Sequence, residues 1–124
     1  MAKKVLIVDD DSTVRELYEE VLKDEGFEVE TAADGEEGLT KITEGGYNLI
    51  LLDIMMPKLD GIGILTSLSE KQPKIKNGPI ILLTNLAHDP QIEEALKMGA
   101  KAALIKADLT PLQFVEKIKT YLPI

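Results

Sequence analysis

Four short, continuous apolar runs spread along the chain constrain its fold more than any other feature. They cover residues 5–8, 49–52, 80–83 and 102–105, and a fifth run at 27–32 alternates between apolar and polar side chains. Continuous runs of this length are typical of parallel strands buried on both faces, whereas alternation is typical of a strand with one exposed face. The sequence therefore predicts five strands, with 27–32 nearest an edge of the sheet.

Helical patterns fill the intervals between the predicted strands. Thr13 followed by Glu16 has the form of a capping box, and so does Thr110 followed by Gln113, with Pro111 at the first helical position. Glycines after several of these patterns end the helices. The expected helices cover residues 13–25, 36–44, 62–70, 90–98 and 111–122.

The alternation of strands and helices predicts the class of fold. Right-handed crossovers place helices on both faces of a parallel sheet, so the pattern predicts a doubly wound α/β domain. Helical spacing places Leu17, Leu96 and Leu112 on the buried faces of three helices. In such domains the functional site lies beyond the carboxyl ends of the strands, where the strand order reverses.

The composition fits one domain over residues 1–124 and excludes several classes of function. The chain has 124 residues, a formal net charge of -8 and no cysteine. The negative charge opposes direct binding to nucleic acid or to an anionic membrane surface, and the absence of cysteine excludes disulfides and thiol chemistry. No segment has the length of a membrane span or the form of a signal peptide, so we expect a cytoplasmic protein.

Polar residues follow or end four of the predicted strands. Asp9 and Asp10 come after the first run, Asp53 after the third, Thr84 after the fourth and Lys106 after the fifth. Because the carboxyl ends of parallel strands meet at one edge of the sheet, the fold brings these side chains together. Carboxylates that meet repel one another unless a cation lies between them, and hard oxygen ligands select Mg²⁺ or a similar ion. The sequence therefore predicts a magnesium site at this edge.

The same residues fit phosphoryl transfer. A nearby cation would keep Asp53 ionised and nucleophilic, while Lys106 and the Thr84 hydroxyl would bind phosphoryl oxygens. Taken singly, each acid is better explained by a helix cap or a turn, as Asp11 is. His88 stands alone, without companions at metal-ligand spacing. Capping does not explain a threonine and a lysine at matching strand ends, so the set favours the functional interpretation.

Four segments resemble the receiver domains of two-component response regulators in order and spacing. They are VLIVDDDS, LILLDIMMPKLDGIGIL, PIILLT and KMGAKAALIKADL, and the similarity covers essentially the whole chain. The resemblance implies a single, chemotaxis-regulator-like receiver domain with the flavodoxin-like strand order 2-1-3-4-5. It also implies that Asp9 and Asp10 bind Mg²⁺ with Asp53 and the backbone carbonyl of Met55, that Asp53 is phosphorylated, that Thr84 and Lys106 contact the phosphoryl group, and that Pro57 and Gly61 form the turn after the acceptor.

The resemblance further implies a phosphoryl donor and an output. The donor is a phosphohistidine on a histidine kinase or phosphotransfer protein, and the receiver catalyses its own phosphorylation and slow self-dephosphorylation but no other reaction. Phosphorylation switches a surface that binds a protein effector within a phosphorelay. We expect a monomer or a weak homodimer, and neither nucleic acid nor a membrane is an expected partner.

The residues at four positions bear on how a receiver of this kind would switch and how long it would stay phosphorylated. Ala103 stands where the family commonly has Tyr or Phe, whose ring moves inward as Thr84 shifts, and Ala107 stands where it usually has proline. In receivers, the residue two after the acceptor and the residue two after the threonine flank the path of the attacking water, and the resemblance assigns these positions to Met55 and Leu86. Because both side chains are apolar, we expect a long-lived phosphoryl group.

Three other interpretations stay open from the sequence alone. VLIVDDDSTV also fits small Mg²⁺-dependent phosphatases of the haloacid-dehalogenase type, with Asp9 as nucleophile and Asp11 as acid/base. Their further metal-binding acids follow the lysine, however, whereas Asp53 precedes Lys106. A flavodoxin-like nucleotide binder would need a Gly- and Ser/Thr-rich phosphate loop after the first strand, where acids stand instead. The third alternative is a receiver that is never phosphorylated and serves as an interaction module.

Overall fold

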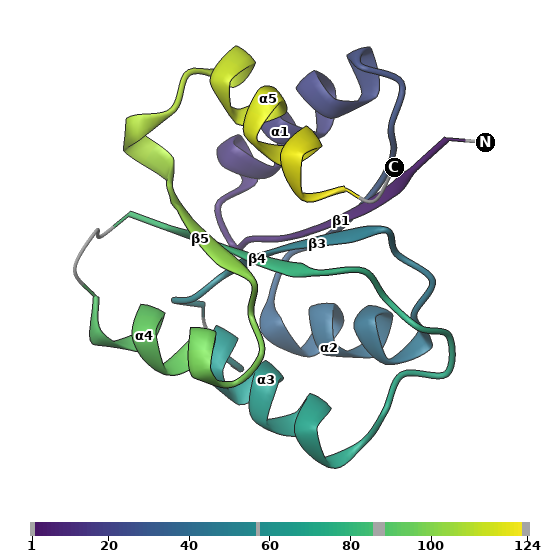
Figure 1. Ribbon diagram of the computed structural model, residues 1–124, viewed down its shortest axis with the longest axis vertical. Helices are drawn as coiled ribbons and strands as arrows, with labels where there is room; N and C mark the ends of the chain where they lie inside the picture. The colour runs from purple at the N-terminus through teal and green to yellow at the C-terminus, as the bar shows by residue number, and fades with distance from the viewer. Residues whose placement is uncertain (1, 57, 86–88, 123–124) are drawn as a thin grey trace.

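The structure, a computed structural model, contains a five-stranded parallel sheet with helices on both faces (Figure 1). It describes residues 2–56, 58–85 and 89–122, so the expectations for Pro57, Leu86 and His88 lie outside the described residues. The strand order is β2-β1-β3-β4-β5, which confirms the predicted doubly wound fold and its order. The elements are β1 (Lys4–Val8), α1 (Ser12–Asp24), β2 (Glu28–Ala32), α2 (Gly35–Glu44), β3 (Leu49–Asp53), α3 (Gly61–Glu70), β4 (Ile80–Thr84), α4 (Pro90–Lys97), β5 (Ala102–Ile105), the short 3-10 helix η1 (Lys106–Asp108) and α5 (Pro111–Tyr121).

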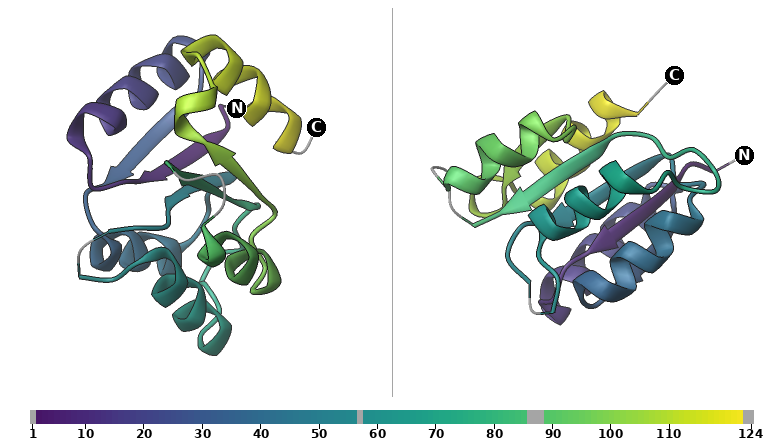
Figure 2. Two further views of the ribbon diagram at one scale, coloured as in Figure 1. Left: turned by 90° about the vertical axis from the view of Figure 1, so that its left-hand side faces the viewer. Right: turned by 90° about the horizontal axis from the view of Figure 1, so that it is seen from below.

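Two layers of helices enclose the sheet, as three views of the molecule show (Figures 1 and 2). α1 and α5 cover one face, while α2, α3 and α4 cover the other. Leu6 and Val8 of β1 belong to the core under α2, α3 and α4, whereas Val5 and Ile7 belong to the core under α1 and α5. All four side chains are fully buried, which explains why this run is apolar without a break. Burial of each stabilises the fold by roughly 2 kcal/mol.

β2 is an edge strand, as its alternating sequence predicted. Within the described residues it pairs only with β1, in a register that places Glu30 opposite Leu6. Val29 packs against the core under α1 and α5. Glu30, on the other face of the strand, accepts a hydrogen bond from the Tyr47 hydroxyl instead. The alternation of the sequence thus reflects one apolar and one polar face.

The first helix begins one residue earlier than predicted, because Asp11 rather than Thr13 is its cap. The Asp11 carboxylate accepts hydrogen bonds from the backbone N–H groups of Thr13 and Val14, at 2.9 and 3.3 Å. Asp11 lies just outside the helix, so its side chain reaches the free amides of the first turn, whereas Thr13 is already helical. The cap predicted at Thr110 is confirmed, with both bonds of its capping box to Gln113.

Three leucines that were predicted to be buried are exposed, and those predictions were wrong. Leu17, Leu96 and Leu112 expose 44%, 39% and 63% of their surface. In α1 and α5 the inward positions belong to Tyr18 and Phe114, whose ring centroids lie 4.1 Å apart with planes 12° apart. A ring buries more apolar area than a leucine, so the stacked pair determines which sides of these two helices face the sheet.

The carboxyl ends of β1 and β3 lie side by side at the point where the strand order reverses. The chain leaves β1 for α1 on one face and leaves β3 for α3 on the other, so the two loops diverge from this point. After β5 the chain turns at once into η1. Peptide bonds between described residues are all trans, including the bond from Lys106 to Ala107. Among the described helices, none combines the length and the apolar character that crossing a bilayer requires.

Candidate functional site

A pocket of about 380 Å³ at the carboxyl end of the sheet collects the residues predicted for the site. Asp9 directly follows β1, Asp53 and Thr84 are the last residues of β3 and β4, and Lys106 directly follows β5. Neighbouring parallel strands end at the same level, which is why residues far apart in the sequence meet here. The pocket is lined by Asp9, Asp10, Asp11, Val14, Asp53, Met55, Thr84, Asn85 and Lys106, and so includes all six predicted site residues.

Three carboxylates lie close together in this pocket. One carboxylate oxygen from each of Asp9, Asp10 and Asp53 lies within 4.8 Å of the other two. Asp9 is fully buried, Asp53 is 7% exposed, and Asp10 is exposed to solvent. Negative charges at this separation repel one another, and their oxygens are the hard ligands that Mg²⁺ prefers. The donor set therefore fits a small divalent cation.

Lys106 reaches into the pocket between two of these acids. Its Nζ lies 2.7 Å from Oδ2 of Asp9 and 3.4 Å from Oδ2 of Asp53, and only 9% of its side chain is exposed. Burial by itself disfavours the ammonium, but the hydrogen bond to Asp9 and the charges of both acids outweigh it, so the pKa of Lys106 is raised. The lysine is therefore a permanent cation in the pocket.

Asp53 is the acid whose protonation is most perturbed. Burial is the largest cause, the charge of Asp9 adds to it, and together they raise the pKa of Asp53 to about 6. Lys106 and the backbone N–H of Met55, which donates to Oδ1 of Asp53 at 3.3 Å, act in the opposite direction without cancelling the rise. A carboxylate that is destabilised in this way gains from a cation or from a covalent bond to an electrophile.

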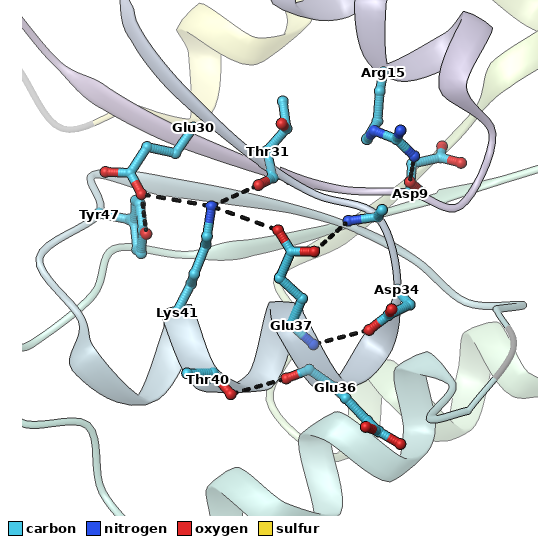
Figure 3. A network of polar contacts seen from close by, with 11 residues as sticks. Asp9, Arg15, Glu30, Thr31, Asp34, Glu36, Glu37, Thr40, Lys41 and Tyr47 are labelled. Atoms are coloured by element: carbon cyan, nitrogen blue, oxygen red, sulfur yellow. Dashed lines mark hydrogen bonds and ion pairs between the residues drawn. The ribbon is translucent and has the colours of Figure 1, made fainter.

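Every polar group of Asp9 has a hydrogen-bond partner. Its N–H donates to the carbonyl of Ala32 at 3.2 Å, and its carbonyl accepts from Nη1 of Arg15 at 2.7 Å (Figure 3). Its Oδ1 accepts from the N–H of Asp11 at 2.9 Å, and its Oδ2 accepts from Lys106. Each carboxylate oxygen has a second lone pair, so Asp9 can still help to ligate a cation. Asp9 is thus the most firmly held acid of the three.

Sequence reasoning missed Arg15. It is the only arginine in the chain, and it lies six residues after Asp9, on the first turn of the helix that leaves β1. That spacing carries no recognised motif. Only the fold, which turns the helix back beside the strand end, shows that this guanidinium reaches the Asp9 carbonyl.

The remaining pocket residues differ in how closely they are tied to the site. Thr84 is buried, and its place in register opposite Ile105 puts it beside the end of β5. Met55 exposes 62% of its surface at the rim. The Asp11 carboxylate accepts hydrogen bonds from two backbone amides of α1, as expected of a helix cap. This role opposes the acid/base role that a phosphatase would require of Asp11.

A second polar cluster lies between β2 and α2, outside the pocket (Figure 3). The Tyr47 hydroxyl donates to Oε1 of Glu30 at 2.9 Å, and Nζ of Lys4 lies 2.8 Å from Oε2 of the same carboxylate. Nζ of Lys41 donates to the carbonyl of Thr31 at 2.7 Å. The hydrogen bond from Lys4 is the main reason that the pKa of Glu30 is lowered. These contacts tie the edge strand to its neighbours.

The sequence matches the family model described as response regulator receiver domain over residues 5–119. Among curated proteins, it is 41% identical over 120 residues to the probable transcriptional regulator ycf27 of Cyanophora paradoxa, covering 97% of this chain and 48% of that protein. It is 40% identical to the transcriptional regulatory protein CpxR homolog of Haemophilus influenzae, covering 96% and 50%. The chain thus spans about half the length of these curated relatives.

Solved structures share the fold over nearly the whole chain. A CheY-like response regulator receiver domain protein from Methanospirillum hungatei JF-1 has a TM-score of 0.82 and 36% identity, with 97% of this chain and 93% of that chain covered. The response regulator TrrA of Thermotoga maritima, solved in complex with Mg(2+)-BeF, has a TM-score of 0.80 and 35% identity, with 97% and 99% covered. Neither the phosphatase nor the nucleotide-binding interpretation is favoured by these matches.

Proposed function

The chain belongs to the response regulator receiver family, and on that premise we propose that Asp53 is its phosphoryl acceptor. The observation that carries the proposal is the position of Asp53 at the end of β3, beside a cationic lysine and two further acids in an open pocket. Its carboxylate is destabilised in the free protein, with a pKa raised to about 6 mainly by burial. Bond formation to phosphorus moves the charge from the buried carboxylate to phosphoryl oxygens, whose added negative charge Lys106 and a bound cation would offset.

The donor is a phosphohistidine on a histidine kinase or a phosphotransfer protein. An oxygen of Asp53 forms a bond to phosphorus as the bond from phosphorus to the imidazole nitrogen breaks, and the imidazole leaves with the electron pair and takes up a proton. Mg²⁺, when bound, neutralises phosphoryl oxygens and keeps Asp53 ionised. Asp9, Asp10 and Asp53 would hold the ion together with the Met55 carbonyl.

Two cationic or polar groups of the chain complete the site. Lys106, already 3.4 Å from Oδ2 of Asp53, binds one phosphoryl oxygen, and the Thr84 hydroxyl binds another. The pull on Thr84 is transmitted through Asn85 toward α4, and this movement presents a surface to a protein effector. The chain catalyses its own phosphorylation and the slow hydrolysis of the resulting aspartyl phosphate. It catalyses no other reaction.

The wider setting follows from the charge and the relatives. The named relatives are transcriptional regulators about twice as long as the matched region. The net charge of -8 opposes contact between this domain and DNA. We propose that residues 1–124 form one receiver domain and that this domain acts in the cytoplasm. Its direct partners are then the phosphoryl donor and a protein effector, and it acts as a monomer or weak homodimer.

Identifying the modified residue tests the proposal. The protein is incubated with a phosphorylated histidine kinase and Mg²⁺, the acyl phosphate is trapped by borohydride reduction, and peptides are sequenced by mass spectrometry. Asp53→Asn should abolish labelling, and Asp108→Asn, an exposed acid outside the pocket, should not. Label on Asp9 would establish the phosphatase chemistry instead, and no label with any kinase or with acetyl phosphate would favour the unphosphorylated alternative.

A further inference from the structure

The peptide unit between Asp9 and Asp10 carries the two acids that β1 contributes to the pocket. Asp9 is held by four hydrogen bonds, but the exposed Asp10 carboxylate makes no hydrogen bond or ion pair within the described part of the chain. Its position therefore depends on the backbone that carries it. Anything that fixes this peptide plane also fixes where Asp10 points.

Arg15 is the side chain that contacts this peptide. Its Nη1 donates to the Asp9 carbonyl at 2.7 Å (Figure 3), and no carboxylate of the described residues lies within ion-pair distance of its guanidinium. The Asp9 carbonyl and the Asp10 N–H belong to one rigid planar unit, which also includes the Cα of Asp10. A hydrogen bond to the carbonyl oxygen at one end of the unit therefore limits rotation of the whole unit.

We propose that Arg15 is a positioning residue for the cation site: it holds the Asp9–Asp10 peptide so that the Asp10 carboxylate meets those of Asp9 and Asp53. The inference rests on the proposed function, because it assumes that the three acids take up Mg²⁺. The N–H of Asp9, bonded to Ala32, and the Arg15 bond to its carbonyl act on opposite ends of the residue. Strand β2 and helix α1 thus clamp the strand end between them.

The charge of Arg15 would have the opposite effect to its hydrogen bond, and this difference makes the inference testable. A guanidinium near the pocket repels a divalent cation, so loss of the charge alone should tighten Mg²⁺ binding. Loss of an outer hydrogen bond that orients a metal ligand typically weakens binding by 10- to 100-fold. The direction of the change in affinity therefore separates positioning from electrostatics.

Mg²⁺ affinity is measured by NMR titration of the amide signals of Asp10, Asp53 and Met55 in four proteins. Arg15→Met keeps the aliphatic stem and removes the charge and the donors, and we expect its dissociation constant to rise about 10-fold. Arg15→Lys keeps the charge and one donor group and should lie between Arg15→Met and the unchanged protein. Lys23→Met is the matched control, because it removes an exposed charge at the far end of α1 and should leave the affinity within about twofold.

A second readout needs no metal. Without Mg²⁺, hydrogen exchange of the Asp9 and Asp11 amides, which are hydrogen-bonded at this strand end, should be faster in Arg15→Met than in the unchanged protein, while thermal unfolding confirms that the variant is folded. Arg15→Gln, a neutral variant with a shorter stem, serves if the methionine variant does not fold. Equal or tighter Mg²⁺ binding in the variant that lacks the charge would overturn the inference.

Failure of the inference and failure of the proposed function give different results. If the unchanged protein shows no Mg²⁺-dependent shifts at Asp10, Asp53 or Met55, the proposed function is wrong and the inference falls with it. If the unchanged protein binds Mg²⁺ and is phosphorylated on Asp53 but Arg15→Met binds the ion equally well, only the inference is wrong.

Discussion

The Nζ of Lys106 lies 2.7 Å from Oδ2 of Asp9, closer than the 3.4 Å that separates it from Oδ2 of Asp53. The fully buried Asp9 is therefore the anchor of the lysine, and Asp53 is its second partner. If the bond to Asp9 is kept when Asp53 is phosphorylated as proposed, Lys106 would need only a small movement to reach a phosphoryl oxygen. In the metal-free protein the same lysine is the cation that offsets the crowded acids.

Replacement of Lys106 should therefore make the stability of the protein depend on Mg²⁺. Lys106→Met leaves the buried Asp9 and Asp53 without their cation, and removal of one partner from a buried ion pair costs about 3 kcal/mol. We expect a loss of stability of that order in urea unfolding at pH 8 without Mg²⁺, and a smaller loss with saturating Mg²⁺. Lys101→Met, at an exposed position before β5, is the control. A loss that Mg²⁺ does not reduce would argue against a cation site beside Asp9.

Removal of the acceptor carboxylate should stabilise the metal-free protein. The pKa of Asp53 is raised from 3.8 to about 6 by burial, so as pH increases the unfolded chain loses this proton first and the folded state is penalised. Asp53→Asn removes the penalty. It should be more stable than the unchanged protein by up to about 3 kcal/mol above pH 6, and the difference should vanish below about pH 4. Denaturant unfolding of both proteins across this pH range measures the difference in stability. A difference that does not change with pH would show that the raised pKa of Asp53 is not its cause.

The edge strand supplies a stability term with the opposite pH dependence. The pKa of Glu30 is lowered, chiefly by the hydrogen bond from Lys4 and also by that from Tyr47. A lowered pKa stabilises the folded state above the ordinary value of 4.5, and this stability is lost as pH falls through the lowered pKa. Glu30→Gln should destabilise the protein at pH 7 by less than about 1 kcal/mol, because the carboxylate is 37% exposed. Glu28→Gln, on the same strand, should have a smaller effect, because the charge of Glu28 acts on Lys4 without a hydrogen bond.

Much of the fold follows from local sequence, and each exception has its own physical cause. The strands and the ends of most helices depend on apolar runs and caps, which act over a few residues, whereas the strand order was implied by the resemblance to receiver domains. The stack of Tyr18 on Phe114 joins residues nearly a hundred positions apart, so helical spacing alone favoured Leu17 and Leu112. Arg15 was missed for a different reason: it lies only six residues from Asp9, but its partner there is a backbone carbonyl, which the sequence does not show.

The convergence of the candidate site residues was predictable because neighbouring parallel strands end at the same level. Asp9, Asp53 and Lys106 each stand at a strand end, and parallel topology alone brings them together. The sequence did not indicate that Lys106 would favour Asp9 over Asp53, since that preference depends on distances of a few tenths of an ångström. It also did not indicate that Asp10 alone of the three acids would be exposed.

The rim of the pocket should control how long the phosphoryl group lasts. Met55 exposes 62% of its surface beside Asp53 and cannot orient a water molecule for attack on phosphorus. Met55→Asn places an amide there, and we expect hydrolysis to become several-fold to about 100-fold faster. The phosphorylated fraction is followed over time after the donor is removed. Met55→Leu keeps the position apolar and should hydrolyse at the rate of the unchanged protein; faster loss in both variants would point to packing rather than polarity.

The last prediction concerns how the signal leaves the site. Ala103 lies in β5 opposite Leu82 of β4 and packs against the core under α2, α3 and α4. A methyl group cannot fill and vacate a pocket as an aromatic ring does, so one element that would make two states discrete is absent at this position. Thr84, at the end of β4, can still be drawn toward a phosphoryl oxygen, because the hydroxyl gains a charged acceptor.

We therefore expect the response to stay near the site. Fluoroberyllate with Mg²⁺ stands in for the phosphoryl group on Asp53, and hydrogen exchange is compared with and without it across residues 84–121. Changes should concentrate at Asn85 and the first turn of α4, with little change at Ala103 or in α5. Asp53→Asn with the same reagents is the control and should show none of them. A large cooperative change centred on Ala103 and α5 would sink this prediction, and the stacked rings of Tyr18 and Phe114 would then be the first place to look for the moving element.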